Sequence, residues 1–444
     1  MNHYTKEEVL QLIEEQDVEF IRLQFTDYRG NLKNIAITSR QLQEVLENGA
    51  KFDAAIVDRF PNIEGLERYL EPDFNTFEIF PWRPQQGKVA RLLCDTLLED
   101  GTPSDGNPRL ALKKVVERAA KMGYRIYINP DLEFFLFDTD EQAGPTTSTG
   151  ERAGYFDVGP LDCGENARRD IVMSLEAMGI NVNSSHHEAA PAQHEIDLSR
   201  TEALEAADNI QTARLAVRTL AKRHGLHGTF MPKPLFGENG SGLHLHIYLE
   251  KDGRDLFYNP EDDYRLSPEA YGFIAGLTEH LQGACAFTNP LVNSYKRLVD
   301  GFDAPVYIAW SAVNRNQMIR VSMGAKEGES RLELRSPDGA SNPYLMLAAV
   351  LSAGLDGIEK NLQAPHPIDD NIREMTPDER MLLGIRKLPE TLIEAVEALE
   401  KDPLFREVMG NTIISRYLTI KHQEWDEYRI QVSEWELKEY LNRY

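Results

Sequence analysis

The stretch that most constrains the fold of this chain runs from Ser185 to Asp197 and reads Ser-His-His-Glu-Ala-Ala-Pro-Ala-Gln-His-Glu-Ile-Asp. Pro191 and the small residues beside it rule out a continuous helix, so the acidic groups of the segment can converge on one point. Glu188 and Glu195 lie there beside three histidines. Such a dense set indicates a site, although a solvated acidic loop has the same composition and stays open as an alternative.

Length and charge narrow the class of protein. The chain has 444 residues, which is longer than a domain with a single hydrophobic core usually is, so we expect two domains of unequal size. Lysine and arginine number 48 against 72 aspartates and glutamates, and the resulting net charge of −24 repels phosphate backbones and anionic membranes. We therefore expect no nucleic acid and no membrane as partners, whereas divalent cations suit the excess of carboxylates.

The cysteines and the first residues bear on the compartment. Cys94, Cys163 and Cys285 are scattered without metal-ligand spacing, and an odd, sparse set argues against a disulfide framework. The first residues contain neither a basic leader nor an apolar core, and no later run is long enough to span a bilayer. We expect a cytoplasmic protein.

The pattern of elements predicts two domains, residues 1–104 and residues 105–444. In the first, a capping box at Thr5 opens a short helix, turn residues at 27–31 indicate a hairpin, and further strands complete a small α+β unit. Segment 100–106 is rich in Gly, Asp and Pro and is typical of a linker. In the second, helices are predicted near 108–123, 166–178, 202–224, 268–284 and 343–361, with Trp425 and Trp435 as packing anchors of a helical end.

Three short strands each place charged residues on one face. Period-two geometry puts Asp131 and Glu133 on the same side of the first strand, and His244 and His246 on the same side of the second. Residues 331–335 alternate arginine, glutamate and arginine with leucine. Plain amphipathic strands explain any one of these patterns. Together, carboxylate, imidazole and guanidinium groups describe a site for metals and phosphate.

The expected metal ligands are mostly hard oxygen donors with one imidazole, which suits two Mg²⁺ or Mn²⁺ ions better than zinc. They are Asp131, Glu133, Glu188, Glu195, His244 and Glu333. A set of arginines would bind an anion bidentately if buried near these metals, either a substrate carboxylate or a transferring phosphoryl group, and surface solubility is the alternative. They are Arg297, Arg315, Arg320, Arg331 and Arg335.

In chain order these pieces resemble the bacterial type I family of glutamine synthetases, and most closely its type I-α form. The motifs are Asn-Pro-Asp-Leu-Glu-Phe-Phe, Ser-His-His-Glu with Gln-His-Glu-Ile-Asp, Met-Pro-Lys-Pro-Leu-Phe, Asn-Gly-Ser-Gly-Leu-His, Asn-Ser-Tyr-Lys-Arg-Leu, Arg-Leu-Glu-Leu-Arg and Asn-Pro-Tyr-Leu. The resemblance covers nearly the whole chain. It implies an α+β fold, with a small N-terminal β-grasp domain and a large catalytic α/β domain, assembled as a dodecamer of two stacked hexameric rings.

The resemblance also implies a role for each site residue. Metal near glutamate and ammonia would be bound by Glu133, Glu188 and Glu195, and metal on the nucleotide phosphates by Asp131, His244 and Glu333, with two to three Mg²⁺ or Mn²⁺ ions per site. Glutamate would be bound by Glu133, Asn239, Gly240, His244, Arg297 and Arg335, and the phosphates by His246, Arg315, Arg320 and Arg331. The catalytic set would be Asp53, from the adjoining subunit, with Asp303 and Arg315.

The implied chemistry fits these residue types. A carboxylate resists attack by an amine, so ATP first converts the side chain of glutamate to γ-glutamyl phosphate, and ammonia then displaces phosphate. Because the amine arrives protonated at neutral pH, a carboxylate must bind the cation and take its proton. Asp53 and Asp303 match the family positions for that task.

Several positions depart from the family pattern. Asp131 and Asp303 stand where the family usually has glutamate, and each lacks one methylene. After Asp53 the chain has Ala-Ala-Ile in place of Gly-Ser-Ser, which makes the acceptor pocket less polar. Two alternatives therefore stay open: a ligase for a larger amine such as ethylamine or a polyamine, and a catalytically silent regulatory homologue. Asn62 replaces the feedback-sensing arginine of the type I-α form, so feedback by glutamine is in doubt.

Overall fold

The N-terminal part of the chain forms a five-stranded sheet in the order β2-β1-β5-β4-β3. A computed structural model describes residues 4–58, 67–324, 326 and 328–444, and Asn62 lies outside the described residues. The strands are β1 (Val18–Thr26), β2 (Leu32–Thr38), β3 (Ala50–Asp53), β4 (Glu67–Ile79) and β5 (Lys88–Leu97). β1 and β5 are parallel, and each has an antiparallel neighbour on its other side, which is the predicted β-grasp arrangement.

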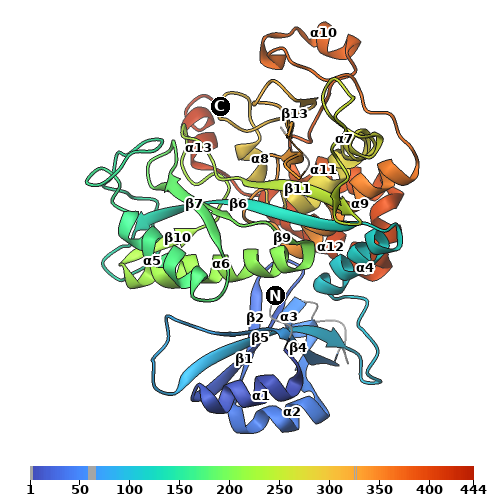
Figure 1. The fold of residues 1–444 in the computed structure, drawn as a ribbon. Coiled ribbons are helices and arrows are strands. Elements are labelled where there is room, and N and C mark those ends of the chain that lie inside the picture. The colour runs from blue at the N-terminus through green and yellow to red at the C-terminus, as the bar shows by residue number, and fades with distance from the viewer. Residues whose placement is uncertain (1–3, 59–66, 325, 327) are drawn as a thin grey trace.

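Helices on one face of this sheet close the small core. α1 (Lys6–Glu15) and α2 (Leu42–Asn48) lie along the outer face in Figure 1, whereas α3 (Ala54–Asp58) follows β3 directly. The predicted capping box is confirmed, because the Thr5 hydroxyl accepts from the N–H of Glu8 and the Glu8 carboxylate accepts from the N–H of Thr5. After Thr38 the chain forms a 3-10 turn, Ser39–Gln41, that leads directly into α2.

The larger part of the chain is built on a ten-stranded mixed sheet. Its main path runs β14-β15-β16-β11-β6-β8-β7. These strands are β6 (Arg125–Asp138), β7 (Val182–His187), β8 (Gln193–Leu198), β11 (Leu243–Lys251), β14 (Trp310–Ser311), β15 (Ile319–Ser322) and β16 (Arg331–Leu334). Three short strands complete this sheet: β9 (Thr201–Glu202) and β10 (Leu226–Thr229) pair with β6, and β12 (Arg254–Asp255) pairs with β11. A separate two-stranded sheet is formed by β13 (Tyr307–Ile308) and β17 (Arg386–Lys387).

The five helices predicted in the larger domain are confirmed as α4 (Pro108–Lys121), α5 (Glu165–Glu176), α6 (Ala203–Arg223), α7 (Pro268–Thr288) and α9 (Pro343–Glu359). Shorter or later helices are α8 (Ser294–Arg297), a 3-10 turn at Ile372–Glu374, α10 (Pro377–Leu382), α11 (Leu392–Lys401), α12 (Pro403–Arg429) and α13 (Glu434–Tyr440). α5 and α6 cover one face of the sheet, and α7 packs against α9 (Figure 1). No described helix has the length and apolar character that a membrane span requires.

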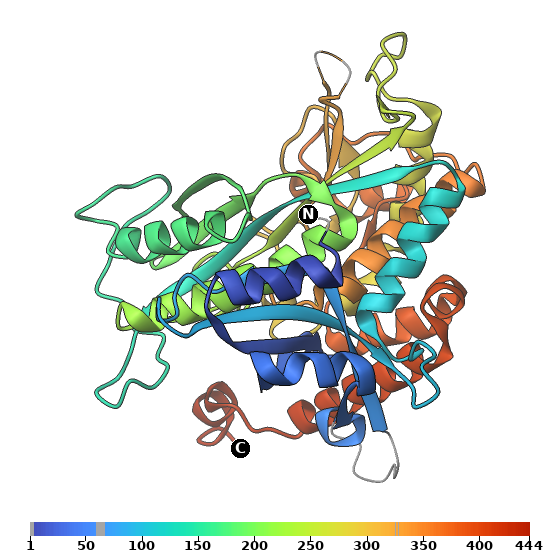
Figure 2. The same ribbon diagram turned by 60° about the horizontal axis from the view of Figure 1, so that its bottom comes forward.

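The boundary predicted between residues 104 and 105 falls in the connection between β5 and α4. Arg109 of α4 crosses this junction, because its guanidinium lies within 3.3 Å of Asp73 and Asp95 and within 2.8 Å of Asp208 in α6. At the far end, Trp425 packs against the large core as predicted. The prediction for Trp435 is wrong: its side chain is 61% exposed on α13, which projects from the body of the molecule in Figure 2.

Alternation along β6 decides which side of the sheet carries the polar groups. Leu132, Phe134 and Leu136 are buried in the large core, on the side that α6 covers. Because successive side chains of a strand point to opposite faces, Asp131 and Glu133 lie on the other face. The core packing of the even-numbered residues therefore sets the direction of the acidic ones.

Candidate active site

Neighbouring strands bring the predicted residues into one row across the sheet. His244 of β11 lies opposite Asp131 of β6, His246 of β11 opposite Glu333 of β16, Glu133 of β6 opposite Glu195 of β8, and Arg320 of β15 opposite Glu333. The three strands that the sequence showed separately are thus adjacent, with β8 and β15 extending the row on either side. Carboxylate, imidazole and guanidinium groups from five strands share one face of one sheet.

At the β8 side of the row, acidic groups gather closely. Ligand atoms of His186, Glu188 and Glu195 lie within 4.8 Å of one another, and so do those of Asp131, Glu195 and Asp197. The segment Ser185 to Asp197 that carries most of them is a β-hairpin of β7 and β8. His186 and Asp197 were missed among the candidate ligands, although Asp197 is two residues from Glu195 and therefore on the same strand face.

At this end of the row the carboxylates lie close enough to repel one another. Burial, followed by repulsion from Glu188, raises the pKa of Glu133 to about 7. Burial also raises the pKa of Glu195, and the neighbouring Glu133 and Asp197 add to that effect. Divalent cations would remove the repulsion, and oxygen donors with one or two imidazoles are a set that Mg²⁺ or Mn²⁺ accepts.

Backbone and amide donors fix the position of Glu133. Its Oε2 accepts from the N–H of Gly242 at 2.9 Å and from Nε2 of Gln193 at 2.9 Å. Gln193 also donates to the carbonyl of Gly240 at 3.1 Å, and it is a further residue that sequence reasoning missed. A Cβ at position 240 would stand 2.2 Å from the carbonyl oxygen of Pro232, so this position requires glycine.

Two acidic groups of the row, Asp131 and Glu333, have cationic or imidazole partners within the protein. Arg331 Nε donates to His246 Nδ1 at 3.2 Å, and His246 Nε2 donates to Asp131 Oδ2 at 2.7 Å. This chain of hydrogen bonds fixes the imidazole tautomer. Arg320 lies 3.1 Å from Glu333 Oε2.

His244 stands between the two ends. Its Nε2 lies 3.5 Å from Glu133 Oε1, and its Nδ1 lies 3.8 Å from Glu333 Oε1. Burial, followed by the charges of Arg335 and Arg297, lowers the pKa of His244 well below its usual range. The imidazole is therefore neutral, which is the form that binds a metal.

The other predicted cationic residues take different positions. Arg335 lies 3.5 Å from Glu333 and 3.8 Å from Asp303, and it donates to the backbone carbonyl of Arg315, whose own side chain is exposed. Asp303 is 67% exposed and has a φ of 51°. Arg297 is buried, and its guanidinium donates to the backbone carbonyls of residues 335–337. Its predicted contact with a substrate stays a prediction, as does that of the half-buried Asn239.

Asp53 stands apart from the row. It is exposed at the end of β3 in the N-terminal domain, where its Oδ1 accepts from the N–H of Ala55 at 2.8 Å. Among the described residues, no hydrogen bond or ion pair joins Asp53 to the row. Ala54 and Ala55 are buried, so in the single chain both side chains pack into the domain.

The fold and this row define a two-domain α+β enzyme whose site suits divalent cations and phosphate. Comparison with protein families gives the same architecture. Residues 17–99 match the β-grasp domain of glutamine synthetase, and residues 105–440 match its catalytic domain. The chain belongs to the glutamine synthetase family.

Relatives match along the whole chain. Glutamine synthetase of Clostridium saccharobutylicum is 51% identical over 444 residues, which is 100% of both chains, and that of Staphylococcus epidermidis is 48% identical over 442 residues, 99% of both. Among solved structures, GmaS without ligand superposes with a TM-score of 0.88 at 32% identity, covering 98% of this chain and 99% of that one. Plasmodium falciparum glutamine synthetase has a TM-score of 0.87 at 26% identity, covering 99% of each.

Proposed function

We propose that this chain is an ATP-dependent ligase that converts glutamate and ammonia to glutamine through γ-glutamyl phosphate. The observation that carries the proposal is the 51% identity with a glutamine synthetase, unbroken over all 444 residues. The row of carboxylates, imidazoles and arginines supports it, because phosphoryl transfer to a carboxylate needs neutralised phosphoryl oxygens, and the displacement of phosphate that follows needs a bound amine.

Two to three Mg²⁺ or Mn²⁺ ions would be held by the acidic and imidazole groups. Glu133, Glu188 and Glu195 would hold one near glutamate and ammonia, and Asp131, His244 and Glu333 one near the phosphates. The triad of Asp131, Glu195 and Asp197 has the spacing for a third. Bound ions would neutralise phosphoryl oxygens and reduce their repulsion of the attacking carboxylate.

The remaining roles belong to the cationic and turn residues. Phosphates would be bound by His246, Arg315, Arg320 and Arg331, and glutamate by Glu133, Asn239, Gly240, His244, Arg297 and Arg335. Asp303, with Arg315, would act on the reacting groups, since Asp303 is an exposed carboxylate 3.8 Å from Arg335, at the edge of the row. A carboxylate at this place can bind an ammonium ion and accept its proton.

Asp53 would complete the site of an adjoining subunit in a dodecamer of two hexameric rings. Its exposure, and its separation from the row of its own chain, support this arrangement. The unpaired Cys94, Cys163 and Cys285 support a reducing, cytoplasmic compartment. We propose the same two domains as above, 1–104 and 105–444.

A coupled assay of ADP release tests the acceptor. The purified enzyme is given ATP, Mg²⁺ and glutamate with ammonia, methylamine, ethylamine or a polyamine, and the product is identified by mass spectrometry. We expect glutamine from ammonia at the highest kcat/KM. A higher kcat/KM with ethylamine or a polyamine would establish the larger-amine ligase instead.

Absence of ADP release with every amine would establish the silent homologue. One observation speaks against the silent homologue, and a second speaks against the larger-amine ligase. Both acidic sets are intact in one row, which a binding platform does not require. The Staphylococcus relatives at 47–48% identity are likewise glutamine synthetases.

A further inference from the structure

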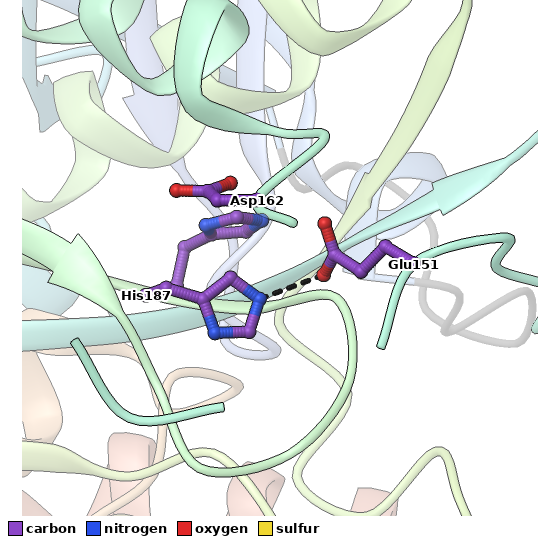
Figure 3. Close-up of side chains that lie close together, drawn as sticks. Glu151, Asp162 and His187 are labelled. Atoms are coloured by element: carbon purple, nitrogen blue, oxygen red, sulfur yellow. Dashed lines mark hydrogen bonds and ion pairs between the residues drawn. The ribbon is translucent and has the colours of Figure 1, made fainter. Parts of the chain in front are cut away.

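Loop 151–164, which leads from β6 toward α5, is fastened at its start to the back of the β7–β8 hairpin. Glu151 Oε1 lies 2.7 Å from His187 Nε2 and also accepts from the N–H of Ala192, while Glu151 Oε2 accepts from the N–H of Cys163 at 2.8 Å. Figure 3 shows the Glu151 carboxylate facing the His187 ring. Both side chains are buried, with exposures of 6% and 0%.

His187 uses both of its ring nitrogens. Nδ1 lies 2.7 Å from the carbonyl oxygen of Glu188 and 3.1 Å from that of Gly154, and Nε2 faces the carboxylate. Carbonyl and carboxylate oxygens only accept, so both nitrogens donate. One imidazole therefore joins both Glu151 and Gly154 of the loop to the backbone of a proposed metal ligand.

A second fastening holds the end of the same loop. Asp162 Oδ2 lies 2.7 Å from a terminal nitrogen of Arg168 in α5, and that nitrogen lies 2.8 Å from His194 Nδ1. His194 immediately precedes Glu195 in β8, as His187 precedes Glu188. Since neighbours along a strand point to opposite faces, each buried histidine lies behind a proposed metal ligand.

Between the two fastenings, the loop presents aromatic rings to the metal face. Tyr155 and Phe156 stack at 4.0 Å between centroids, and both meet the ring of His186 edge-on, at 5.6 and 4.7 Å. His186 in turn lies 2.8 Å from Glu188. The two aromatic side chains are 58% and 60% exposed, so they form a wall beside the acidic end that is open to an incoming molecule.

Glu151, Asp162, His187 and His194 also have ligand atoms within 4.8 Å of one another, as in a metal centre. The guanidinium of Arg168 already contacts two of the four residues, and both nitrogens of His187 are engaged. His194 Nε2 points toward Gly164, whose Cβ, if present, would stand 2.4 Å away. His194 Nε2 is buried without a hydrogen-bond partner among the described residues, but a cation here would meet the guanidinium of Arg168 at contact distance, and this repulsion opposes a metal.

We propose that the Glu151–His187 pair is a positioning pair that sets the aromatic wall of loop 151–164 against the metal-ligand hairpin and thereby determines the size of amine that the enzyme accepts. The inference rests on the proposed function, which places the amine at the acidic end. Phe156 also donates its N–H to the carbonyl of His187 at 3.1 Å, so the aromatic residues follow the position of His187. Loosening the pair shifts His187, and with it Tyr155 and Phe156, while leaving the Arg331–His246–Asp131 chain in place. Ammonia binding and acceptor choice therefore change, and ATP binding does not.

The test compares Glu151→Gln with wild type and with Glu141→Gln, an exposed glutamate of the neighbouring turn. Glutamine cannot accept at both ends, because its amide nitrogen is a donor. We expect roughly a tenfold rise in KM for ammonia, with KM for ATP within about twofold, and a higher ratio of kcat/KM for ethylamine to that for ammonia. Hydrogen exchange of 151–164 should be faster. Glu151→Asp, which keeps the charge, should give an intermediate result and replaces Glu151→Gln should that variant not fold.

Several outcomes would overturn the inference. They are an unchanged KM for ammonia, an equal rise of both KM values together with a lower Tm, or stoichiometric zinc in wild type that is lost in Glu151→Gln. A wild-type protein without ammonia-dependent ADP release would instead reject the proposed function. Exchange of 151–164 in Glu151→Gln against Glu141→Gln would still decide whether the pair positions the loop.

Discussion

The two ends of the row use the same residue types but balance their charges differently. At the β8 end, Glu133, Glu188 and Glu195 are crowded, and the pKa values of Glu133 and Glu195 are raised, by burial first and then by their acidic neighbours. At the β16 end, Glu333 is paired with Arg320 and Arg335. Asp131 stands between the two ends: it is hydrogen-bonded to His246, it also lies in the acidic cluster with Glu195 and Asp197, and burial raises its pKa. Carboxylates are crowded at one end, whereas guanidinium groups lie directly against the carboxylate at the other.

This difference indicates what each end is built to receive. A site whose carboxylates repel one another gains stability from every cation that enters, whether a divalent metal or an ammonium ion. A site that already pairs its carboxylates with arginines can direct the remaining guanidinium nitrogens at an anion such as phosphate. Under the proposed function, we expect this difference in charge to orient the substrates, with phosphate at one end of the row and the amine at the other.

The largest effect is expected from neutralising the crowded end. Glu195→Gln removes a carboxylate that both acidic triads share. We expect kcat to fall roughly a thousandfold, because several kcal/mol of charge stabilisation by metal are lost. Steady-state assays at saturating Mg²⁺ measure it, with Glu176→Gln on the exposed side of α5 as the matched control. A loss of less than about tenfold would contradict the assignment of a metal to this end.

Removing a positive charge from the paired end should reduce activity less than Glu195→Gln does. Arg320→Ala removes the closer of the two guanidinium partners of Glu333, leaving Arg335 at 3.5 Å, and removes a proposed phosphate ligand. We expect kcat/KM for ATP to fall about a hundredfold, which is the usual cost of one transition-state donor. Lys222→Ala, an exposed cation of α6, is the control. Arg320→Lys should recover only part of the loss, and full recovery would show that a point charge is sufficient.

The pH dependence of metal binding sharpens the comparison further. Protonation of Glu133 competes with metal, and its pKa of about 7 means that the group is mostly protonated at pH 6 and mostly ionised at pH 8. Affinity for Mg²⁺ without ATP should therefore rise with pH, roughly tenfold between those values for one competing proton. Calorimetry in two buffers measures both the affinity and the protons released. An affinity independent of pH would contradict the raised pKa.

Much of the fold could be predicted from local patterns. The capping box at Thr5 and the proline that opens α4 are short-range signals, and the structure confirms both helices. Trp435 shows the limit, because a tryptophan in a helix indicates a packing surface without saying which chain supplies the partner.

For the site, period-two alternation correctly grouped Asp131 with Glu133 and His244 with His246. It could not show that β11 lies between β6 and β16, since strand order depends on long-range pairing. The roles of Gln193 and His186 come only from cross-strand neighbours. In the sequence, His187 and His194 stand directly beside Glu188 and Glu195, and only the hairpin register shows that the two histidines lie on the opposite face.

The smallest effect is expected from restoring the side-chain length that the family usually has. Asp131 Oδ2 sits 2.7 Å from His246 Nε2, so Asp131→Glu must fold back its extra methylene or displace the imidazole by about 1 Å. We expect kcat to fall roughly threefold to tenfold, because the carboxylate shifts relative both to His246 and to the acidic cluster with Glu195 and Asp197. The same exchange at exposed Asp378 of α10 is the control. Should Asp131→Glu raise kcat instead, the Arg331–His246–Asp131 chain would not be adapted to aspartate, and the paired end would be tuned by its arginines alone.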